Sequence, residues 1–283
     1  MKKIEPLKKE LKVMKELENL TAMLEQTSAH TIARMKTNIV GSRPFFLEVW
    51  RIHAILKQLA PPPPEVIHKH LIVVIGIDWG MPGNLLNRVI AEAKILQKTH
   101  NADMLVAGKM AHNYFRDEDD DHTIHFFSVP KDALLTDIQP IYKIIAGYAK
   151  VIIVYPNFES LSKQNVTTVS LSIDNKEDEG TLINPALDKS VNISSNRFIV
   201  YPNPQTISNY LNEAAIGLTV HHYFAESILA YSAAQMVAMR NSHDNAKTES
   251  KKTRVKYNRA RRELIDSKLR ELYGSRASHK GNG

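Results

Sequence analysis

Residues 240–256 read RNSHDNAKTESKKTRVK, an almost wholly polar stretch that contains neither glycine nor proline. Apolar residues return at helical spacing on both sides of it, from Tyr210 to Val237 and from Tyr257 to Leu272. Because apolar residues three and four apart mark one face of an α-helix, the pattern predicts one continuous helix of up to ~65 residues. At 1.5 Å per residue that helix is ~100 Å long, too long for a single globule to enclose.

A second long helix is predicted at the amino terminus, residues 1–60. Pro44 can kink it, and the four prolines at 61–64 end it and favour a stiff extended linker over residues 61–67. The apolar positions that share the helical spacing are Leu7, Leu11, Met14, Leu17, Leu20, Leu24, Thr27 or Ser28, Ile32, Met35 and Ile39. This face needs a partner, and the long carboxyl-terminal helix is the natural one.

Between the two helices, the apolar periodicity changes. Leu71–Ile77 is a continuous apolar run, typical of a strand buried on both faces. Further strands are predicted at Met104–Ala107, Ile124–Val129, Val151–Tyr155, Val166–Ile173 and Phe198–Tyr201, with helices at Leu85–Thr99 and Ile138–Ala149. Strands that alternate with helices imply parallel crossover units. The predicted fold class is α/β, with a long antiparallel coiled coil of residues 1–60 and 204–283 and an inserted Rossmann-like domain at 68–203.

Composition narrows the functional classes. The net charge is +7, and both terminal helices are basic whereas residues 58–239 are net acidic. A basic helix presents either a solvated face or a surface for an acidic partner, which can be phosphate or protein carboxylate. The absence of cysteine excludes disulfides and thiolate metal sites. No apolar run reaches the ~18 residues of a membrane span, and residues 1–12 lack a signal-peptide core, so we expect a location on the cytoplasmic side.

No catalytic or nucleotide site is predicted. Gly76, Gly80 and Gly83 follow a predicted strand and precede a predicted helix, but their spacing of four and three differs from the G-x-G-x-x-G turn that approaches a dinucleotide pyrophosphate. The sequence also lacks the G-x-x-x-x-G-K-[ST] loop of the P-loop NTPases.

Histidines and carboxylates give only weak metal or catalytic signals. His112, His122 and His125 flank the acidic run 117–121, which does not have the spacing of a calcium-binding loop and is typical of a solvated loop. His221 and His222 lie near Glu226 on a helical stretch, where packing is the simpler interpretation. We therefore expect no catalytic residue, no cofactor and no metal.

Three stretches resemble the gamma subunits of F-type ATP synthases. Residues 236–246, MVAMRNSHDNA, resemble the family's A-R-M-x-A-M-x-x-A-T-D-N-A. Residues 257–265, YNRARRELI, are similar to Y-N-x-x-R-Q-A-x-I, and residues 151–164 are similar to the strand and loop containing Y-N-x-F-x-S-x-x-x-Q. Weaker matches are Gly108-Lys109 and residues 198–202, and all of them are collinear across nearly the whole chain.

The chain also departs from the family pattern. The family's S-D-R-G-L-C-G-G appears at residues 77–84 as IDWGMPGN, which lacks the arginine, the cysteine and one glycine. Arg262 replaces a glutamine, Glu25 replaces a lysine and Tyr201 replaces a glutamate. The resemblance is that of a divergent member or paralogue.

The resemblance implies a non-catalytic central rotor stalk inside an α3β3 hexamer whose β subunits hold the nucleotide sites. It places Arg261 and Arg262 against an acidic β-subunit loop, with a solvated face as the alternative. It places Leu269, Leu272 and Tyr273 in an apolar bearing near the tip of the stalk. Asp78 and Trp79 would lie on the α/β domain, near the epsilon subunit and the membrane ring of c subunits, peripheral to the cytoplasmic face of the cell membrane or the equivalent organelle face.

Two other functional classes stay open from the sequence. One is a gamma-like shaft of a repurposed rotary ATPase without a membrane ring. The other is a basic coiled-coil scaffold or nucleic-acid-binding protein, whose binding is steeply salt-dependent because phosphate contacts release counterions. The rotor interpretation predicts no nucleic-acid partner. The coupling ion is selected in the c-ring and is not encoded in this chain.

Overall fold

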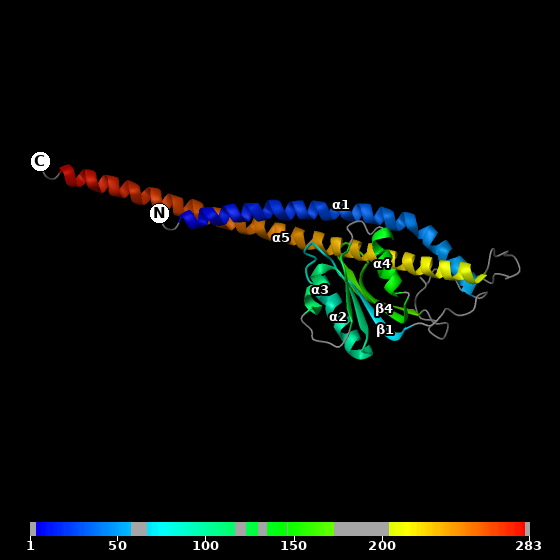
Figure 1. Ribbon diagram of the computed structural model, residues 1–283. Helices are drawn as coiled ribbons and strands as arrows, with labels where there is room; N and C mark the ends of the chain where they lie inside the picture. Colours follow the sequence, from blue (N-terminus) through cyan, green and yellow to red (C-terminus); the bar gives the residue numbers. More distant parts are fainter. Residues whose placement is uncertain are drawn as a thin grey trace. The chain divides into compact units, whose positions relative to one another are not determined.

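The computed structural model describes residues 4–57, 67–116, 123–129, 135–145, 147–172 and 204–280. Two long helices, α1 (Ile4–Lys57) and α5 (Pro204–Lys280), begin and end the described chain (Figure 1). Both expected terminal helices are therefore present. At 77 residues, α5 is longer than its apolar pattern predicted.

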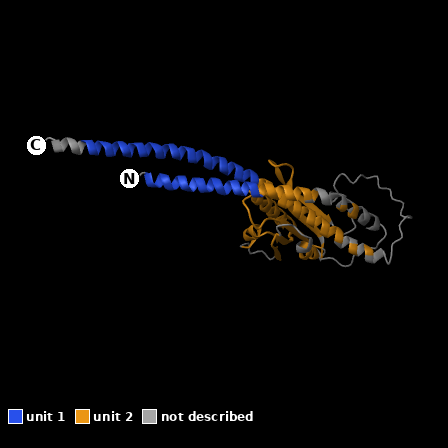
Figure 2. Ribbon diagram, turned by 90° about the horizontal axis from the view of Figure 1, so that it is seen from above, with its two compact units in different colours: residues 1–27, 236–283 blue, residues 28–235 orange. Residues whose placement is uncertain are grey.

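The chain forms two compact units, and each long helix contributes to both. One unit consists of residues 1–27 and 236–283, and the other of residues 28–235 (Figure 2). Helix α1 continues through Gly41 and Pro44, where the sequence allowed an interruption or a kink. The predicted proline linker lies outside the described residues, except for its last residue, Ile67, where β1 begins.

The larger unit contains a five-stranded sheet in the order β3-β2-β1-β4-β5. Its strands are β1 (Ile67–Ile75), β2 (Asp103–Ala107), β3 (Ile124–Phe127), β4 (Tyr148–Phe158) and β5 (Gln164–Ser172). The connecting helices are α2 (Leu85–His100), α3 (Lys109–Phe115) and α4 (Leu135–Ile145). Because β1 to β4 are parallel and alternate with helices, the predicted Rossmann-like pattern is confirmed for this part of the sheet.

One sequence-based prediction needs correction, and two features were not predicted. The direction of β5 was not predicted: it is antiparallel to β4, because a short hairpin joins the two strands. The helix predicted to end at Ala149 ends at Ile145, and Tyr148 already belongs to β4. Helix α3 was not predicted, since its seven residues are too few for a clear helical period. The predicted strand 198–201 lies outside the described residues.

Helices cover both faces of the sheet. Leu71 to Ile75 of β1 are fully buried, as expected for a strand with two covered faces. On one face, Ile72 and Val74 pack in a core with residues of α2 and α3. On the other face, Tyr155 of β4 meets Tyr223 of α5 with ring centroids 4.6 Å apart. Helix α5 therefore belongs to the core of the α/β unit and is not only an arm attached to it.

Candidate partner-contact surfaces

In the smaller unit, the two ends of the chain pair in opposite directions. The His243 ring Nδ1 lies 3.1 Å from the Glu18 carbonyl oxygen, and the Thr253 hydroxyl donates to Glu10 Oε1 at 3.0 Å. Moving towards the start of α1 therefore corresponds to moving towards the end of α5. Thr253 is only 1% exposed, so this polar contact is covered from water.

The covered positions of both helices repeat with a spacing of three and four. On α5 they are Met239, His243, Ala246, Ser250, Thr253, Tyr257, Ala260 and Leu264. On α1 they include Leu7, Leu11, Met14, Glu18, Thr21 and Glu25. We call these two rows together the seam. An average spacing of 3.5 residues keeps one helix face against a partner along its length.

The seam differs from the apolar row predicted on α1. Leu17 and Leu20 were expected on the covered face, but they are 40% and 51% exposed. Glu18 and Thr21 lie on the seam in their place. The Thr21 hydroxyl donates a hydrogen bond within its own helix, to the Leu17 carbonyl oxygen at 2.8 Å. The rest of the predicted row is covered as expected: Leu24 is half-covered, and Ser28, Ile32 and Met35 are buried. The row therefore fails at Leu17 and Leu20, where the seam is polar.

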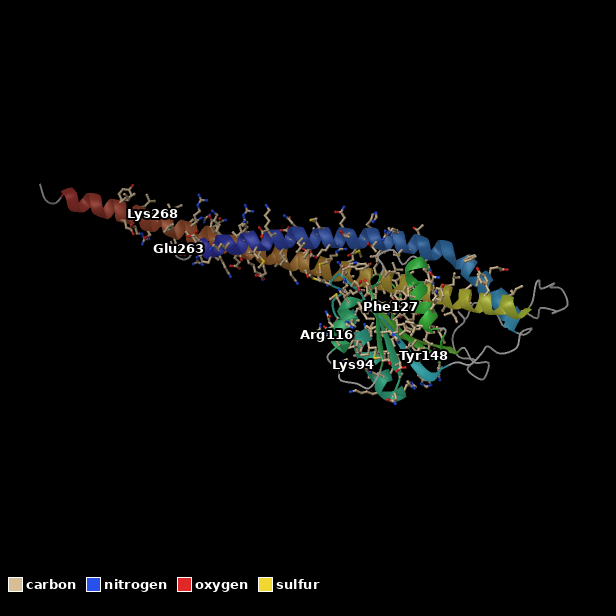
Figure 3. The ribbon with its side chains drawn as sticks, in the orientation of Figure 1. Lys94, Arg116, Phe127, Tyr148, Glu263 and Lys268 are labelled. Atoms are coloured by element: carbon tan, nitrogen blue, oxygen red, sulfur yellow. The ribbon has the colours of Figure 1, made fainter. Side chains whose placement is uncertain are left out.

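Beyond the seam, α5 is exposed. Leu264 is the last half-covered position, and every described side chain from Ile265 to Tyr273 is exposed. Figure 3 labels Lys268 within this part of α5 and Glu263 just before it. Leu269, Leu272 and Tyr273, which the sequence singled out for partner contact, lie on it, and Arg261 and Arg262 are exposed just before the last seam position. Leu269 is 46% exposed, and Leu272 and Tyr273 are 63% and 69% exposed, which is a large apolar area for a single helix.

In the larger unit, Asp78 ties together the loops at the carboxyl-terminal edge of the sheet. Its Oδ1 accepts from the backbone N–H of Lys109 at 2.6 Å, and its Oδ2 accepts from the backbone N–H of Val129 at 3.1 Å and from the Ser128 hydroxyl. These donors follow β2 and β3, whereas Asp78 follows β1. The carboxylate is therefore engaged within the domain, which the sequence did not predict.

Gly80, in the turn that contains Asp78, and Gly108, next to Lys109, both have positive φ angles. Gly80 has φ +103°, and a Cβ there would lie 2.6 Å from Oε1 of Gln235 on α5. Gly108 has φ +106°, and a Cβ there would lie 2.5 Å from the Ile77 nitrogen. L side chains rarely adopt this conformation, so both positions favour glycine, and at Gly108 the backbone of Ile77 also leaves no space for a Cβ.

The same turn exposes two large apolar side chains. Trp79 is 43% exposed, and Met81 is 61% exposed. Trp79 occupies the place of the arginine in the family motif. Of the two predicted contact residues in this turn, Trp79 therefore offers an accessible surface, whereas Asp78 holds the turn in shape.

The chain's own helix α5 meets the edge of the sheet where doubly wound folds bind ligands. That position is the crevice at the carboxyl ends of the two strands where the strand order reverses, here β1 and β4. The Tyr231 hydroxyl donates to the Ile75 carbonyl at the end of β1 at 3.0 Å, and Ala230 and Tyr231 join the core there. Helix α5 therefore occupies part of the edge at which doubly wound folds usually bind a ligand.

Glu226 of α5 is a half-buried carboxyl group that faces β4. Burial raises the pKa of Glu226 to about 7, although a hydrogen bond from the Tyr155 hydroxyl opposes the rise. Burial and the nearby Glu226 charge raise the pKa of Tyr223 to about 12. The His222 Nε2 lies 3.8 Å from Glu226 Oε2. We expect Glu226 to change charge near neutral pH.

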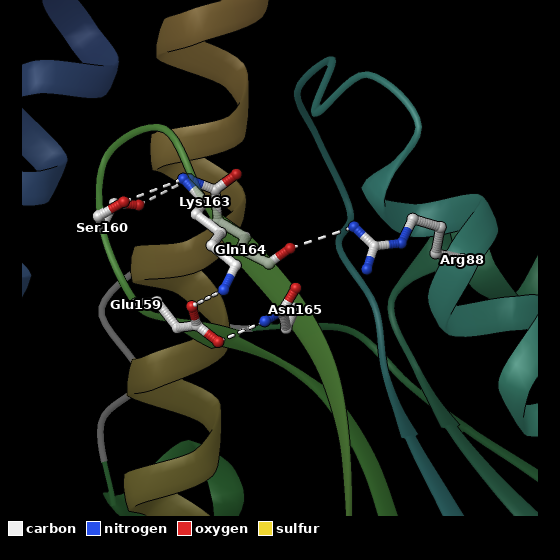
Figure 4. Close-up of polar contacts among 6 residues, drawn as sticks. All are labelled: Arg88, Glu159, Ser160, Lys163, Gln164 and Asn165. Carbon is white, nitrogen blue, oxygen red and sulfur yellow. Dashed lines mark hydrogen bonds and ion pairs between the residues drawn. The ribbon is translucent and has the colours of Figure 1, made fainter.

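The motif at residues 151–164 forms β4 and the tip of the β4–β5 hairpin. The Gln164 side chain donates to the carbonyls of Ser160 and Leu161 at 2.9 and 2.8 Å, which closes the tip. Lys163 pairs with Glu159 at 2.7 Å, and Arg88 of α2 donates to the Gln164 carbonyl at 3.1 Å (Figure 4). The motif residues therefore shape a turn and do not form a catalytic group.

Of the histidines weighed as metal ligands, the structure describes His112 and His125. His112 packs on Phe126 with ring centroids 4.4 Å apart, whereas His122 and the acidic run 117–121 lie outside the described residues. Within the ranges that the structure describes, no three His, Asp or Glu side chains are arranged to hold a metal ion.

Sequence reasoning missed Tyr155, Tyr231 and Gln235, which join α5 to the sheet. Glu226 was noted only as a neighbour of the histidine pair. The available signal was the apolar and aromatic run 223–231, which is too rich in large side chains for a helix with one covered stripe.

The comparisons with known proteins agree across the chain. A family model described as ATP synthase matches residues 3–278. The ATP synthase gamma chain of Bdellovibrio bacteriovorus is 25% identical, with 99% of this chain and 100% of that protein covered. The gamma chain of Chlorobaculum parvum is 26% identical, with 93% and 94% covered.

Solved structures show the same fold. The rotor of the Euglena gracilis mitochondrial ATP synthase matches with a TM-score of 0.62 at 17% identity, covering 93% of this chain and 98% of that one. The central stalk and c-ring structure from Tetrahymena thermophila matches with a TM-score of 0.58 at 16% identity, covering 78% and 98%. Among the described residues, no helix has both the length and the hydropathy of a membrane span. Because the family model covers almost the entire sequence, the chain belongs to the ATP synthase family, as a homologue of its gamma chains.

Proposed function

We propose that this chain is the rotating central shaft of an F-type ATP synthase or ATPase, which couples ion flow through a membrane ring to ATP synthesis or hydrolysis in an α3β3 head. The observation that carries the proposal is the heptad-spaced antiparallel seam, beyond which α5 continues with exposed apolar side chains. This spacing is that of a left-handed coiled coil. The chain has no catalytic role of its own and acts through its shape on the β-subunit sites.

The polar middle of the seam suits a shaft that meets three changing surfaces. Glu18, Thr21 and Ser250 lie where a coiled coil usually places leucine or isoleucine. Because buried polar contacts add little net stability, the pairing there is weaker than in an apolar seam. A shaft built this way can adjust its pairing as the surrounding subunits change conformation.

We assign the exposed part of α5 to the inside of the head. Arg261 and Arg262 would face an acidic loop of the β subunit, because guanidinium groups bind carboxylates in paired geometry. Leu269, Leu272 and Tyr273 would turn in an apolar bearing formed by the α and β subunits. Their exposure is consistent with a partner that covers them.

We assign the α/β domain, residues 68–203, to the foot of the rotor, near the epsilon subunit and the c-ring. The arms are residues 1–60 and 204–283, and the linker is 61–67. In the turn after β1, Trp79 is the contact residue, because Asp78 already holds three donors of its own domain. The complex would be peripheral to the cytoplasmic face of the membrane, or to the equivalent face of an organelle.

Co-expression with candidate α and β subunits tests the proposal. We expect a stable complex with one copy of this chain per six head subunits, and an ATPase rate that depends on its presence. The size of the complex gives its stoichiometry. An ATPase assay with and without the chain measures how far the rate depends on it. If the chain does not enter the hexamer, and ATP hydrolysis is the same without it, the rotor proposal is wrong.

A further inference from the structure

The turn after β1 exposes two large apolar side chains. Trp79 is 43% exposed, and Met81 is 61% exposed. Among residues 76–84, Asp78 carries the only charge, and its carboxylate already accepts three hydrogen bonds from its own domain. The turn therefore offers an apolar contact area, and its one charge is already bound.

Helix α5 supports this turn with an uncharged stretch of its own. The Gln235 side chain packs on Gly80, since a Cβ at Gly80 would lie 2.6 Å from its Oε1 and 3.4 Å from its Cδ. One helical turn earlier, the Tyr231 hydroxyl donates to the Ile75 carbonyl at 3.0 Å, at the end of β1. Residues 227–239 of α5 contain no charged side chain. The helix that supports the turn therefore adds no charge to it.

Trp79, Met81 and Gln235 together, which we call the turn surface, lack two cations that the family motifs contain. Trp79 replaces the arginine of S-D-R-G-L-C-G-G. When the D-N-A of A-R-M-x-A-M-x-x-A-T-D-N-A is aligned with residues 244–246, its arginine falls at Gln235. Because Gln235 packs on Gly80, next to Trp79, both replacements remove positive charge from the same surface. The turn surface thus has no guanidinium group to bind a carboxylate in paired geometry.

We propose that the turn surface binds an apolar, uncharged segment of a partner subunit, and not an acidic one. Tryptophan and methionine are enriched in the cores of protein interfaces, and tryptophan often contributes a large share of the binding energy. Lys109, whose backbone N–H bonds to Asp78, is exposed, so its charge can stay in water at the rim of such an interface. The proposal rests on the proposed rotor function and specifies the chemistry of the partner that Trp79 contacts.

Photo-crosslinking in the assembled complex identifies the segment that the turn surface contacts. The full-length chain with Trp79→p-benzoylphenylalanine is purified with co-expressed α, β, epsilon and c subunits and irradiated, and the crosslinked peptide is sequenced by mass spectrometry. We expect one partner peptide in which apolar and uncharged residues predominate. The same substitution at Ser162, exposed at the tip of the β4–β5 hairpin, is the matched control and should not reach that peptide. A crosslink to an acidic peptide, or none to any partner, overturns the proposal.

Salt dependence separates an apolar partner from an acidic one. Trp79→Ala with Met81→Ala should weaken assembly about tenfold, by the same factor at low and at high ionic strength, because apolar contacts are not screened by salt. Binding isotherms at two ionic strengths measure this, and circular dichroism verifies that each variant is folded.

The reverse change restores the two arginines of the motifs. Trp79→Arg with Gln235→Arg should also weaken assembly, because it places charge against an apolar segment. Tighter assembly at low salt that disappears at high salt would show an acidic partner and overturn the proposal. If the parent assembles and neither double variant changes its affinity, the proposal for the turn surface fails alone. If the parent enters no complex, the rotor proposal fails and this one with it.

Discussion

Asp78 shows how one carboxylate can organise three loops that are far apart in sequence. We expect Asp78→Asn to destabilise the α/β unit by about 1–3 kcal/mol, because hydrogen bonds to a charged acceptor are lost and an amide N–H then faces other donors. Urea unfolding, followed by circular dichroism, measures the change. The domain should still fold, since the rest of its core is unchanged.

Glu92→Gln on α2 is the matched control for Asp78→Asn. It also removes one carboxylate charge from the same unit, but not the ties between the loops. We expect its unfolding midpoint to stay close to that of the parent. Equal effects of the two variants would mean that charge, and not the tie between the loops, matters at Asp78.

Glu226 makes the stability of the α/β unit depend on pH. Its pKa is raised from 4.5 to about 7 in the folded chain, so the folded state holds a proton that the unfolded state releases. Stability from this group is therefore complete below about pH 4.5 and falls as pH rises to about 7, by at most about 3 kcal/mol. Unfolding of the parent and of Glu226→Gln across this window measures it.

Comparing the parent with Glu226→Gln isolates the effect of the Glu226 carboxyl group, because all other titratable groups are present in both chains. We expect the difference in stability between Glu226→Gln and the parent to grow with pH and to level off above about pH 7. Glu263→Gln, on α5 outside the α/β unit, serves as the control for the loss of one carboxyl group from the chain. A flat difference for Glu226→Gln would show that this carboxyl titrates normally.

At the scale of elements, the pairing of the chain's ends can be tested at a single buried position. Ala246 is 3% exposed on the seam, and its neighbour Asn245 is exposed. We expect Ala246→Asp to destabilise the pairing by about 2 kcal/mol or more, because it buries an unpaired charge. Asn245→Asp adds the same charge in water and should change little. The rate of proteolytic cleavage within residues 1–27 and 236–283 of the full chain measures the loss of helix pairing.

The sequence predicted the long helices well and their contact face less well. Spacing of three and four is enough to predict a helix, but the seam is chosen by both helices together. Leu17 and Leu20 belong to a locally apolar row, yet Glu18 and Thr21 keep the heptad phase and lie on the seam. A single sequence shows which residues share each face of a helix. It does not show which of those faces the partner helix contacts.

The sheet illustrates the same limit at its boundaries. The buried run after Gly147 was divided between a helix and a strand, because continuous apolar residues fit either. Only pairing with β1 places Tyr148 in a strand. The direction of β5 was likewise set by the hairpin that Gln164 closes, a detail of turn geometry that periodicity does not contain.

At the scale of the whole molecule, the arginine pair of α5 tests the proposed position in the head. We expect Arg261→Gln with Arg262→Gln to leave the fold intact, since both side chains are exposed, and to weaken assembly with α and β subunits by about three- to tenfold at low salt. The loss should shrink as salt increases. Binding isotherms at two ionic strengths measure it.

Lys251→Gln with Lys252→Gln is the control for the arginine pair, because it removes the same charge earlier on α5. A smaller effect supports a specific acidic loop opposite the arginines. Equal effects at both places would instead favour general attraction between a basic helix and an acidic cavity, and would contradict the specific contact.

The proposed sites were predictable only where a motif marked them. Arg261 and Asp78 were found through family motifs, although the ties made by Asp78 were invisible in the sequence. Tyr231 and Gln235 carried no such mark, because their contacts are distant in sequence: the Tyr231 hydroxyl bonds to Ile75, 156 residues earlier in the chain, and Gln235 lies beside Gly80. Contacts of this kind follow from the fold and not from local pattern.

The bond from Tyr231 to the end of β1 also has a consequence for synthesis. The last described strand of the sheet ends at Ser172, but Ala230 and Tyr231 of α5 belong to the core beside it. We therefore expect the α/β domain to keep an apolar edge uncovered during translation until α5 leaves the ribosome. A chain that is truncated before α5 would leave that edge open to chaperones and to aggregation.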